Sequence, residues 1–425
     1  MIPVGRLTPE IRARYAARRA ALSGPAREAA EKILAEFRKD PDGTIRKLTK
    51  KFDKADLPSF EVSAAEFDRA RERCPQVVQN AIRSMYESVV RYHKQDLARA
   101  FEFQPLKGVS LGKLVVPFER AGLYVPGGLA VYPSSVVMAA APAAVAGVRQ
   151  TALCTPPAAD GTLPDAVLCA AQVCGVSRVF KVGGAQAVFA MAYGTPSVPK
   201  CEIVVGPGNV YVTAAKRLVQ DEVAIDFLAG PTELLVVSDG TTSARFIAAE
   251  LAGQAEHAPD ACCVLVTTRR EQAEAVAGEL EAQAKGLERA DIVRKALAGQ
   301  GALLVADDLD QALAFANEFG AEHLTISTRF PVEALKRIRS AGSVFLGEYS
   351  PVAVGDYGAG PNAILPTHGE ACRRGGLSAN TFVRTVGYQL LSREGLEKLA
   401  PTALTLAKVE NLGAHARSIE VRLEK

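Results

Sequence analysis

Thr232-Glu-Leu-Leu-Val-Val237 is a short run of apolar, partly β-branched residues, and a similar run, Cys262-Cys-Val-Leu-Val266, follows it. Between them lies Ala248-Ala-Glu-Leu-Ala-Gly-Gln-Ala-Glu-His-Ala-Pro259, which has a helical pattern up to the proline. Two strands joined by one helix are the unit from which parallel sheets are built. This part of the chain therefore predicts α/β architecture.

The same alternation continues on both sides of this unit. The strand-like runs form two groups, which predict two Rossmann-like α/β modules with parallel sheets, at residues 105–235 and 236–377. Residues 1–104 have the pattern of a helical N-terminal region, and residues 378–425 that of a helical C-terminal arm. The other runs are Lys113-Leu-Val-Val-Pro117, Thr151-Ala-Leu-Cys-Thr155, Arg178-Val-Phe-Lys-Val182, Cys201-Glu-Ile-Val-Val205, Ala302-Leu-Leu-Val305 and Ser343-Val-Phe-Leu346.

The charges are nearly balanced, with 50 Lys and Arg against 47 Asp and Glu. No segment concentrates basic residues among aromatic ones, which argues against a nucleic-acid partner. The N-terminus, Met1–Arg6, lacks the apolar core of a secretion signal. The most apolar segment, 136–148, is interrupted by Pro142 and is shorter than a membrane span. We therefore expect neither nucleic acid nor a membrane as a partner.

The eight cysteines fall in apolar runs and contain no Cys-x-x-Cys pair. Buried thiols in a reducing compartment explain this arrangement better than disulfides or a cysteine-ligated zinc site. We therefore expect a cytoplasmic protein.

Gln254 and His257 are three residues apart near the end of the helical run that stops at Pro259. This spacing places both side chains on one face of the last helical turn. An amide oxygen and an imidazole nitrogen can form half of a zinc site. The alternative is a surface Gln beside a His favoured by the helix dipole.

Glu322 and His323 stand between a helical pattern and the strand-like run Leu324-Thr-Ile-Ser-Thr328. Ligands of α/β sheets usually lie beyond the carboxyl ends of strands, whereas these residues precede their strand. Adjacent Glu and His side chains can nevertheless divide acid and base work. The alternative is a pair of solvated loop residues.

Gly355-Asp-Tyr-Gly-Ala-Gly-Pro361 holds one acid, Asp356, among small residues. Such a loop lets a ligand approach closely and presents Asp356 as a hard oxygen ligand. The alternative is a turn in which Asp356 binds its own backbone.

Three glycine-containing turns lie in the first predicted module. Val182-Gly-Gly-Ala-Gln-Ala187 and Val205-Gly-Pro-Gly-Asn-Val210 each follow a strand and open a helix, so that each can offer a helix N-terminus to a phosphate. Tyr124-Val-Pro-Gly-Gly-Leu-Ala-Val-Tyr-Pro-Ser-Ser135 predicts a loop followed by a helix that starts at Pro133. None is a G-x-G-x-x-G fingerprint, and structural turns and caps explain them about as well.

Taken in order, these segments resemble the zinc-dependent, NAD-linked histidinol dehydrogenase family. The resemblance runs from Glu119-Arg-Ala-Gly-Leu-Tyr-Val-Pro-Gly-Gly128 to Glu410-Asn-Leu-Gly-Ala-His-Ala-Arg417 and covers nearly the whole chain. It implies an enzyme of histidine biosynthesis that oxidises L-histidinol to L-histidine through a bound aldehyde, with two hydride transfers to NAD. It also implies a homodimer with swapped C-terminal arms.

The same resemblance implies a role for each matching residue. Glu322 and His323 correspond to the catalytic acid/base pair. The zinc ligands would be Gln254, His257, Asp356 and His415. The NAD contacts, in the first module, would be Tyr124, Gln186 and Asn209. The substrate would contact Thr232, Glu410, His323 and the four zinc ligands, with Glu410 and His415 reaching into the partner subunit's site.

Two positions depart from the family's pattern. Ala363 stands where the family usually has His, and Thr232 where it usually has Ser. They leave open an alternative, a paralogous zinc- and NAD-dependent dehydrogenase of another polar alcohol, for example a sulfonated one. Arg373 and Arg374 would then bind the anionic group, although they also fit solvated surface charge. His368 follows Ala363 at an odd spacing, which in an extended segment points it to the opposite face.

Overall fold

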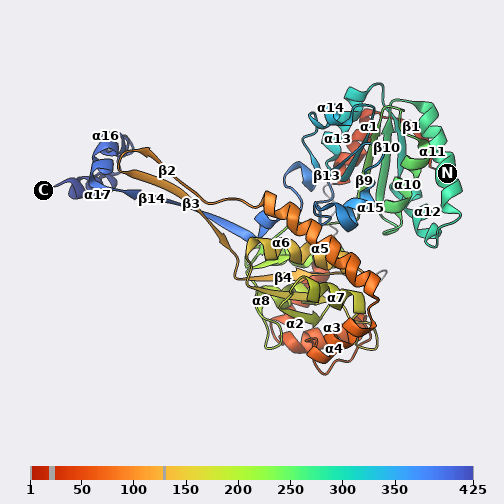
Figure 1. The fold of residues 1–425 in the computed structure, drawn as a ribbon, viewed down its shortest axis with the longest axis horizontal. Coiled ribbons are helices and arrows are strands. Elements are labelled where there is room, and N and C mark those ends of the chain that lie inside the picture. The colour runs from red at the N-terminus through yellow and green to blue at the C-terminus, as the bar shows by residue number, and fades with distance from the viewer. Residues whose placement is uncertain (1, 19–23, 128–130, 425) are drawn as a thin grey trace. The chain divides into compact units, whose positions relative to one another are not determined.

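The structure is a computed structural model that describes residues 2–18, 24–127 and 131–424 (Figure 1). The chain forms two compact units by its internal contacts. The first unit consists of Met1–Asp96 and Glu119–Phe382, and the second of Leu97–Phe118 and Val383–Lys425. The α/β class expected from the sequence is confirmed, because all strand pairs within the first unit's two sheets are parallel.

One sheet of the first unit has the strand order β1-β11-β10-β9-β12-β13 in the described chain. Its central strands alternate with helices, as the sequence predicts. The N-terminal strand β1 pairs with β11, so this sheet also includes residues from the region expected to be helical. The strands are β1 (Val4–Arg6), β9 (Glu233–Ser238), β10 (Cys262–Thr267), β11 (Ala302–Val305), β12 (Ala321–Ser327) and β13 (Ala341–Leu346).

Successive side chains of β9 enter different apolar cores, as expected for a strand that is covered on both faces. Leu234 and Val236 pack with residues of α10, α11 and α12, whereas Leu235 and Val237 pack with residues of α1 and α13. The helices and turns of this module are α1 (Pro9–Ala17), α10 (Ala244–Ala255), α11 (Arg270–Ala284), α12 (Ala290–Gly299), α13 (Leu309–Phe319), α14 (Pro331–Leu335), α15 (Val352–Val354), the π-helical turn η2 (Gly355–Ala359) and the 3₁₀ turns η3 (Glu370–Cys372) and η4 (Ala379–Phe382).

The other sheet of this unit has the order β6-β5-β4-β7-β8 in the described chain. Its helix α6 begins at Pro133, as predicted, and α9 begins after the N-cap Asn209. The strands are β4 (Arg120–Tyr124), β5 (Gln150–Thr155), β6 (Arg178–Lys181), β7 (Ile203–Val205) and β8 (Ala224–Ile225). The helices are α2 (Gly24–Phe37), α3 (Pro41–Phe52), α4 (Ala64–Arg73), α5 (Gln76–Asp96), α6 (Pro133–Ala146), α7 (Asp165–Val173), α8 (Gly184–Tyr193) and α9 (Val210–Val219).

The second unit corrects two expectations of helix. Strand β2 (Phe101–Leu106) lies in the region predicted as a helical N-terminus, and strand β14 (Val383–Leu391) in the arm predicted as helical. Both pair antiparallel with β3 (Val109–Pro117), and β14 does so over its full length. Pairing with a neighbouring strand overrides weak local patterns. Only α16 (Arg393–Val409) and α17 (Gly413–Leu423) give the arm its predicted helical character.

Two further expectations concern thiols and the membrane. The eight cysteines form no disulfide in the described chain, and all except Cys372 are buried, as predicted. Among the described helices, none has both the length and the apolar character needed to cross a membrane.

Candidate active site

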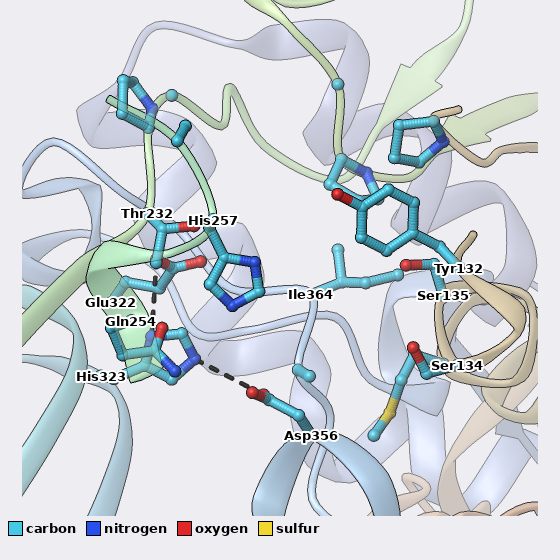
Figure 2. Close-up of a pocket in the computed structure, with 18 of the residues that line it drawn as sticks. Tyr132, Ser134, Ser135, Thr232, Gln254, His257, Glu322, His323, Asp356 and Ile364 are labelled. Atoms are coloured by element: carbon cyan, nitrogen blue, oxygen red, sulfur yellow. Dashed lines mark ion pairs between the residues drawn. The ribbon is translucent and has the colours of Figure 1, made fainter. Parts of the chain in front are cut away.

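A cavity of about 460 Å³ lies in the first unit and is lined by residues of both α/β modules (Figure 2). This volume lies within the usual range for small-molecule sites, about 300–1,000 Å³. The first module contributes Pro126, Tyr132, Ser134, Ser135, Met138, Pro207, Gly208, Asn209 and Val210, and the second contributes Gly230, Pro231, Thr232, Gln254, His257, Ala258, Asp260, Glu322, His323, Asp356, Tyr357, Ala363 and Ile364.

On the first module, the cavity lies beyond the carboxyl ends of two neighbouring strands, β4 and β7. The order of strands reverses between them, because β4 continues to β5 and β6 on one side and β7 continues to β8 on the other. Ligands of open α/β sheets usually bind at such a switch point. The loops that reach the cavity are those that open α6 and α9.

The loop between β7 and α9 is held by a buried ion pair. Lys216 pairs with Asp226, and both are buried. The Lys216 Nζ donates to the Gly206 carbonyl at 3.0 Å, and the Gly206 N–H donates to Asp226 Oδ2 at 2.8 Å. Gly206 has φ of 120°, and a Cβ there would stand 2.0 Å from the Tyr124 carbonyl oxygen. Only glycine therefore allows this loop to pass so close to β4.

On the second module, the cavity is lined by the first residues of strand β12. Glu322 and His323 belong to this strand and are buried, so the alternative of a solvated loop is wrong. They lie at the amino end of β12, as the sequence indicated, rather than at the carboxyl end where ligands are more common. The same edge contains Thr232, which directly precedes β9.

The hydrogen bonds of His323 determine which ring nitrogen carries the proton. Nδ1 lies 3.1 Å from the main-chain oxygen of Glu233, and a carbonyl oxygen can only accept. Nδ1 is therefore the protonated nitrogen of the neutral ring. Nε2 is buried, has no hydrogen-bond partner among the described residues and lies 3.8 Å from Asp356 Oδ1. An unprotonated Nε2 is an available proton acceptor.

Burial shifts the pKa values of the pair in opposite directions. It lowers the pKa of His323 to about 4, so that the ring is neutral at physiological pH. It also raises the pKa of the Glu322 carboxyl well above its usual range, although the hydrogen bond from the Glu233 N–H, at 2.7 Å, favours the carboxylate. Two neighbouring groups with pKa values moved in this way can serve as base and acid.

Gln254, His257 and Asp356 reach the cavity from two further segments. Gln254 lies in the last turn of α10, and His257 lies two residues beyond the end of that helix. Asp356 belongs to the π-helical turn η2, a conformation that is frequent at functional sites. Gly355 permits this turn, because a Cβ there would stand 2.5 Å from the ring of Phe345.

These three side chains offer donors of the kind that zinc binds. Gln254 Oε1 is buried and has no hydrogen-bond partner within the described part of the chain, so it can accept a cation. Burial lowers the pKa of His257, which keeps its imidazole neutral, and raises the pKa of Asp356 to about 6. Within the described residues, no three His, Cys, Asp or Glu side chains are arranged to hold a metal ion, and one of these three donors is an amide.

Of the remaining predicted site residues, Asn209 lines the cavity and the other four lie elsewhere. Tyr124 ends β4 and its hydroxyl accepts a hydrogen bond from the Gly184 N–H at 3.1 Å, while Gln186 is buried in the first turn of α8. Neither is among the described residues that line the cavity, whereas Asn209 is. Glu410 and His415 belong to the second unit, where both are exposed.

The structure also places the residues that depart from the family's pattern. Ala363 lines the cavity, and His368 packs its ring against Gly230 instead of lining the cavity with the other described residues. Arg373 and Arg374 both pair with Glu370 and lie outside the described lining. The two arginines therefore behave as surface charge rather than as part of an anion site.

One residue of functional interest was missed in the sequence, namely Glu233. Its main chain binds both Glu322 and His323. The available signal was a carboxylate at the start of the otherwise apolar run Glu233–Val237, because a charge inside a buried strand requires a partner.

The two parallel sheets and the buried Glu–His pair define an α/β enzyme. The sequence profile of the histidinol dehydrogenase family matches residues 16–423. Histidinol dehydrogenases from Methanothermobacter thermautotrophicus and Natronomonas pharaonis are each 45% identical, over 92% and 99% of both chains. The crystal structure of histidinol dehydrogenase from Elizabethkingia anophelis has a TM-score of 0.90 at 35% identity and covers 93% of this chain and 92% of that chain. The chain belongs to the histidinol dehydrogenase family.

Proposed function

We propose that this protein oxidises L-histidinol to L-histidine through L-histidinaldehyde and passes two hydrides to two molecules of NAD. The family membership over nearly the full length supports this reaction and its place in histidine biosynthesis. The single observation that carries the chemistry is the bare, buried Nε2 of His323 at the cavity. An alcohol oxidation needs a base at this kind of position, because the hydroxyl proton must leave as the hydride departs.

The two catalytic side chains divide the proton transfers. His323 takes the hydroxyl proton at Nε2. Its Nδ1–H keeps its hydrogen bond to the Glu233 carbonyl oxygen during this transfer. We assign to Glu322 the activation of the water that hydrates the aldehyde, in which its carboxylate form takes a proton from that water. His323 assists the loss of the second hydride. The cavity keeps the aldehyde away from bulk water between these steps.

We propose that Gln254, His257, Asp356 and His415 hold one zinc ion per subunit. The orphaned Gln254 oxygen and the neutral His257 ring support the first part of this set. Bound zinc supplies a positive charge that orients a substrate with nitrogen and oxygen donors. Thr232 and Glu410 complete the proposed substrate contacts, together with His323 and the same ligands.

We further propose a division between the two modules, with NAD contacts in residues 105–235 and zinc and acid/base residues in 236–377. Tyr124, Gln186 and Asn209 are the proposed NAD contacts. All three follow or end strands at the carboxyl edge of one sheet, where dinucleotides bind in α/β folds. NAD held by these residues would accept the hydrides.

The C-terminal arm, residues 378–425, is proposed to complete the partner subunit's site in a swapped homodimer. This proposal assigns Glu410 and His415 to that site. The second unit supports it with large apolar side chains that are exposed in the single chain, among them Leu390, Leu406 and Val409. Exposed apolar patches of this kind mark protein contacts. The eight thiols without a disulfide support a cytoplasmic location.

Steady-state formation of NADH from L-histidinol tests the reaction. We expect two NADH for each substrate consumed, and loss of activity after chelation that zinc restores. Turnover of a sulfonated alcohol with no turnover of L-histidinol would instead support the paralogue.

A further inference from the structure

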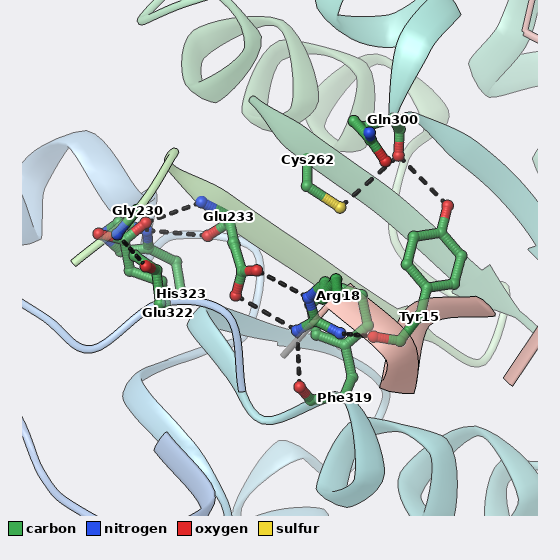
Figure 3. Close-up of polar contacts among 10 residues, drawn as sticks. Tyr15, Arg18, Gly230, Glu233, Cys262, Gln300, Phe319, Glu322 and His323 are labelled. Atoms are coloured by element: carbon green, nitrogen blue, oxygen red, sulfur yellow. Dashed lines mark hydrogen bonds and ion pairs between the residues drawn. The ribbon is translucent and has the colours of Figure 1, made fainter. Parts of the chain in front are cut away.

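Glu233 links the catalytic pair to a helix that lies outside the cavity (Figure 3). Its main-chain N–H donates to Glu322 Oε2 at 2.7 Å, and its carbonyl oxygen accepts from His323 Nδ1 at 3.1 Å. A single peptide segment therefore sets the position of both catalytic side chains. Any displacement of Glu233 would move both of them.

The side chain of Glu233 is held by Arg18, the residue that ends helix α1. Arg18 Nε lies 2.7 Å from Glu233 Oε1, and Arg18 Nη2 lies 3.3 Å from Oε2, which makes the pair two-pronged. The same guanidinium donates to the main-chain oxygens of Phe319 and Tyr15, each at 2.6 Å. It also lies 3.5 Å from the centre of the Phe319 ring. The guanidinium is thus fixed on every side.

Glu233 occupies a position in the sheet at which an apolar residue would be expected. Glu233 shares a strand face with Leu235 and Val237, both of which are in the apolar core. The Glu233 side chain is 1% exposed and that of Arg18 13%. Burying two charges is costly, and well-packed apolar residues often stabilise a fold as well or better. Stability alone is therefore a weak explanation for this pair.

The strand ladder holds Glu233 on one side only. Glu233 pairs with Cys262 of β10, whereas the ladder with β12 begins one residue later, at Leu234 and His323. On the β12 side, the main chain of Glu233 binds the two catalytic side chains instead. The cavity loop that contains Gly230 and Thr232 ends directly before it. The ion pair between Arg18 and Glu233 thus holds β9 at the point where its ladder with β12 has not yet begun.

We propose that Arg18 and Glu233 are positioning residues that fix the direction of Glu322 and the ring orientation and tautomer of His323. This inference rests on the proposed function for its kinetic readout. Arg18 is not among the described residues that line the cavity, and it acts through Glu233. Its loss is expected to slow the chemical step rather than weaken cofactor binding.

The first test is steady-state kinetics of zinc-loaded Arg18→Met. We expect kcat to fall by roughly 10- to 100-fold, because small misplacements of reacting groups have effects of that size, while KM for NAD stays within about twofold. Arg12→Met is the matched control. Arg12 lies on the same helix and pairs with Glu318 of α13, so this variant removes a different ion pair of α1, one that does not involve Glu233. Its kcat is expected to match the wild type.

Two further variants separate positioning from folding. Arg18→Lys keeps the charge but loses the fork, so we expect an intermediate kcat. Arg18→Met combined with Glu233→Gln removes the unpaired buried charge, and its thermal midpoint should recover toward the wild type while kcat stays low. Recovery of both midpoint and kcat in the double variant would show that the pair serves stability alone.

A readout that needs no substrate completes the test. The chain has only five histidines, so ¹⁵N labelling of histidine allows each ring to be resolved in the zinc-loaded protein. We expect His323 to carry its proton on Nδ1 in the wild type and in Arg12→Met, and to lose this single tautomer in Arg18→Met. A wild-type proton on Nε2, or an unchanged ring in Arg18→Met together with unchanged kcat, would overturn the inference. Absence of NADH from wild type and L-histidinol would refute the proposed function, and the ring signals would still decide the role of Arg18.

Discussion

The two modules line the cavity with opposite ends of their strands, and each set of strand ends is called an edge of its sheet here. The first presents the carboxyl ends of β4 and β7, whose loops contribute main chain, hydroxyl groups and Asn209. The second presents the amino ends of β9 and β12, together with the end of α10 and the turn η2. Among the described lining residues, every carboxylate and imidazole comes from the second module.

This difference indicates a division of tasks. Loops and helix N-termini at a carboxyl edge suit a dinucleotide, which needs close backbone approach. Proton transfer needs side chains that cannot change direction, and residues inside a strand meet that need better than loop residues. The predictions below test whether the two edges can be impaired separately.

His323→Asn should have the largest effect, confined to the edge formed by the second module. Loss of a general base typically reduces the rate by ~10²–10⁴-fold, so kcat is expected to fall by at least that lower figure. Zinc content and KM for NAD should remain close to those of the wild type. Stopped-flow measurement of the NADH burst gives the rate, and a loss of less than about tenfold would exclude His323 as the base.

Lys216→Met should impair the first module's side of the cavity, at the loop between β7 and α9. It leaves Asp226 buried without its partner, which typically lowers the free energy of unfolding by about 3–5 kcal/mol. Because the pair holds Gly206, KM for NAD is expected to rise more than kcat falls. Chemical denaturation and initial rates measure the two effects.

Lys200→Met is the control for that variant, since Lys200 forms an exposed pair with Glu222 in the same module. Its free energy of unfolding should change by no more than about 0.5 kcal/mol. Equal losses in both variants would show that burial of the Lys216 pair has no special role.

Gln254→Ala tests the proposed zinc ligands of the second module. It removes the buried, unpartnered amide oxygen, and we expect zinc affinity to fall by at least about tenfold. Competition with a chromogenic chelator measures the affinity directly. NAD binding, followed by fluorescence, should stay unchanged, and a parallel loss would mean that the two edges are not independent.

Asp53→Asn should have the smallest effect, and it concerns the first module away from the cavity. Burial raises the pKa of Asp53 to about 6, and its Oδ2 has no hydrogen-bond partner among the residues that the structure describes. The charged form is therefore unfavourable in the folded state above pH 6, and this cost disappears as the pH falls from 6 towards 4. The variant should gain about 1 kcal/mol of unfolding free energy at pH 7.5, a figure reduced for partial exposure, and nothing near pH 4. Urea titrations at both pH values measure the gain, and an equal gain at both would rule out the titration of Asp53 as its cause.

Much of the α/β core could be predicted from local patterns. The runs 232–237 and 262–266 correspond closely to β9 and β10, because both strands are buried on two faces and are apolar throughout. Strands β1, β2, β4, β8 and β14 were not predicted. Strands β1 and β14 are recognisable as strands only through partners that lie far away in the sequence, whereas β2 forms a hairpin with β3, which begins three residues after β2 ends.

The candidate site could be predicted in part for a similar reason. Gln254, His257 and Asp356 stand in segments whose breaks in pattern are visible in the sequence. The buried position of Glu322 and His323 depends on hydrogen bonds with the main chain of Glu233, which donates to Glu322 and accepts from His323 and lies about ninety residues away. The sequence next to a residue gives no information about such a distant contact.

The position of His323 inside β12 limits how this site can change. A shift of the strand by one residue would turn its side chains to the opposite face of the sheet. Polar side chains such as Glu322 and His323 would then be buried in an apolar core, which is unfavourable. Insertions and deletions in surrounding loops leave the pairing of β12 with β9 and β13 intact. New alcohol preferences should therefore arise at cavity positions outside the strands, such as Thr232 and Ala363, while Glu322 and His323 remain unchanged.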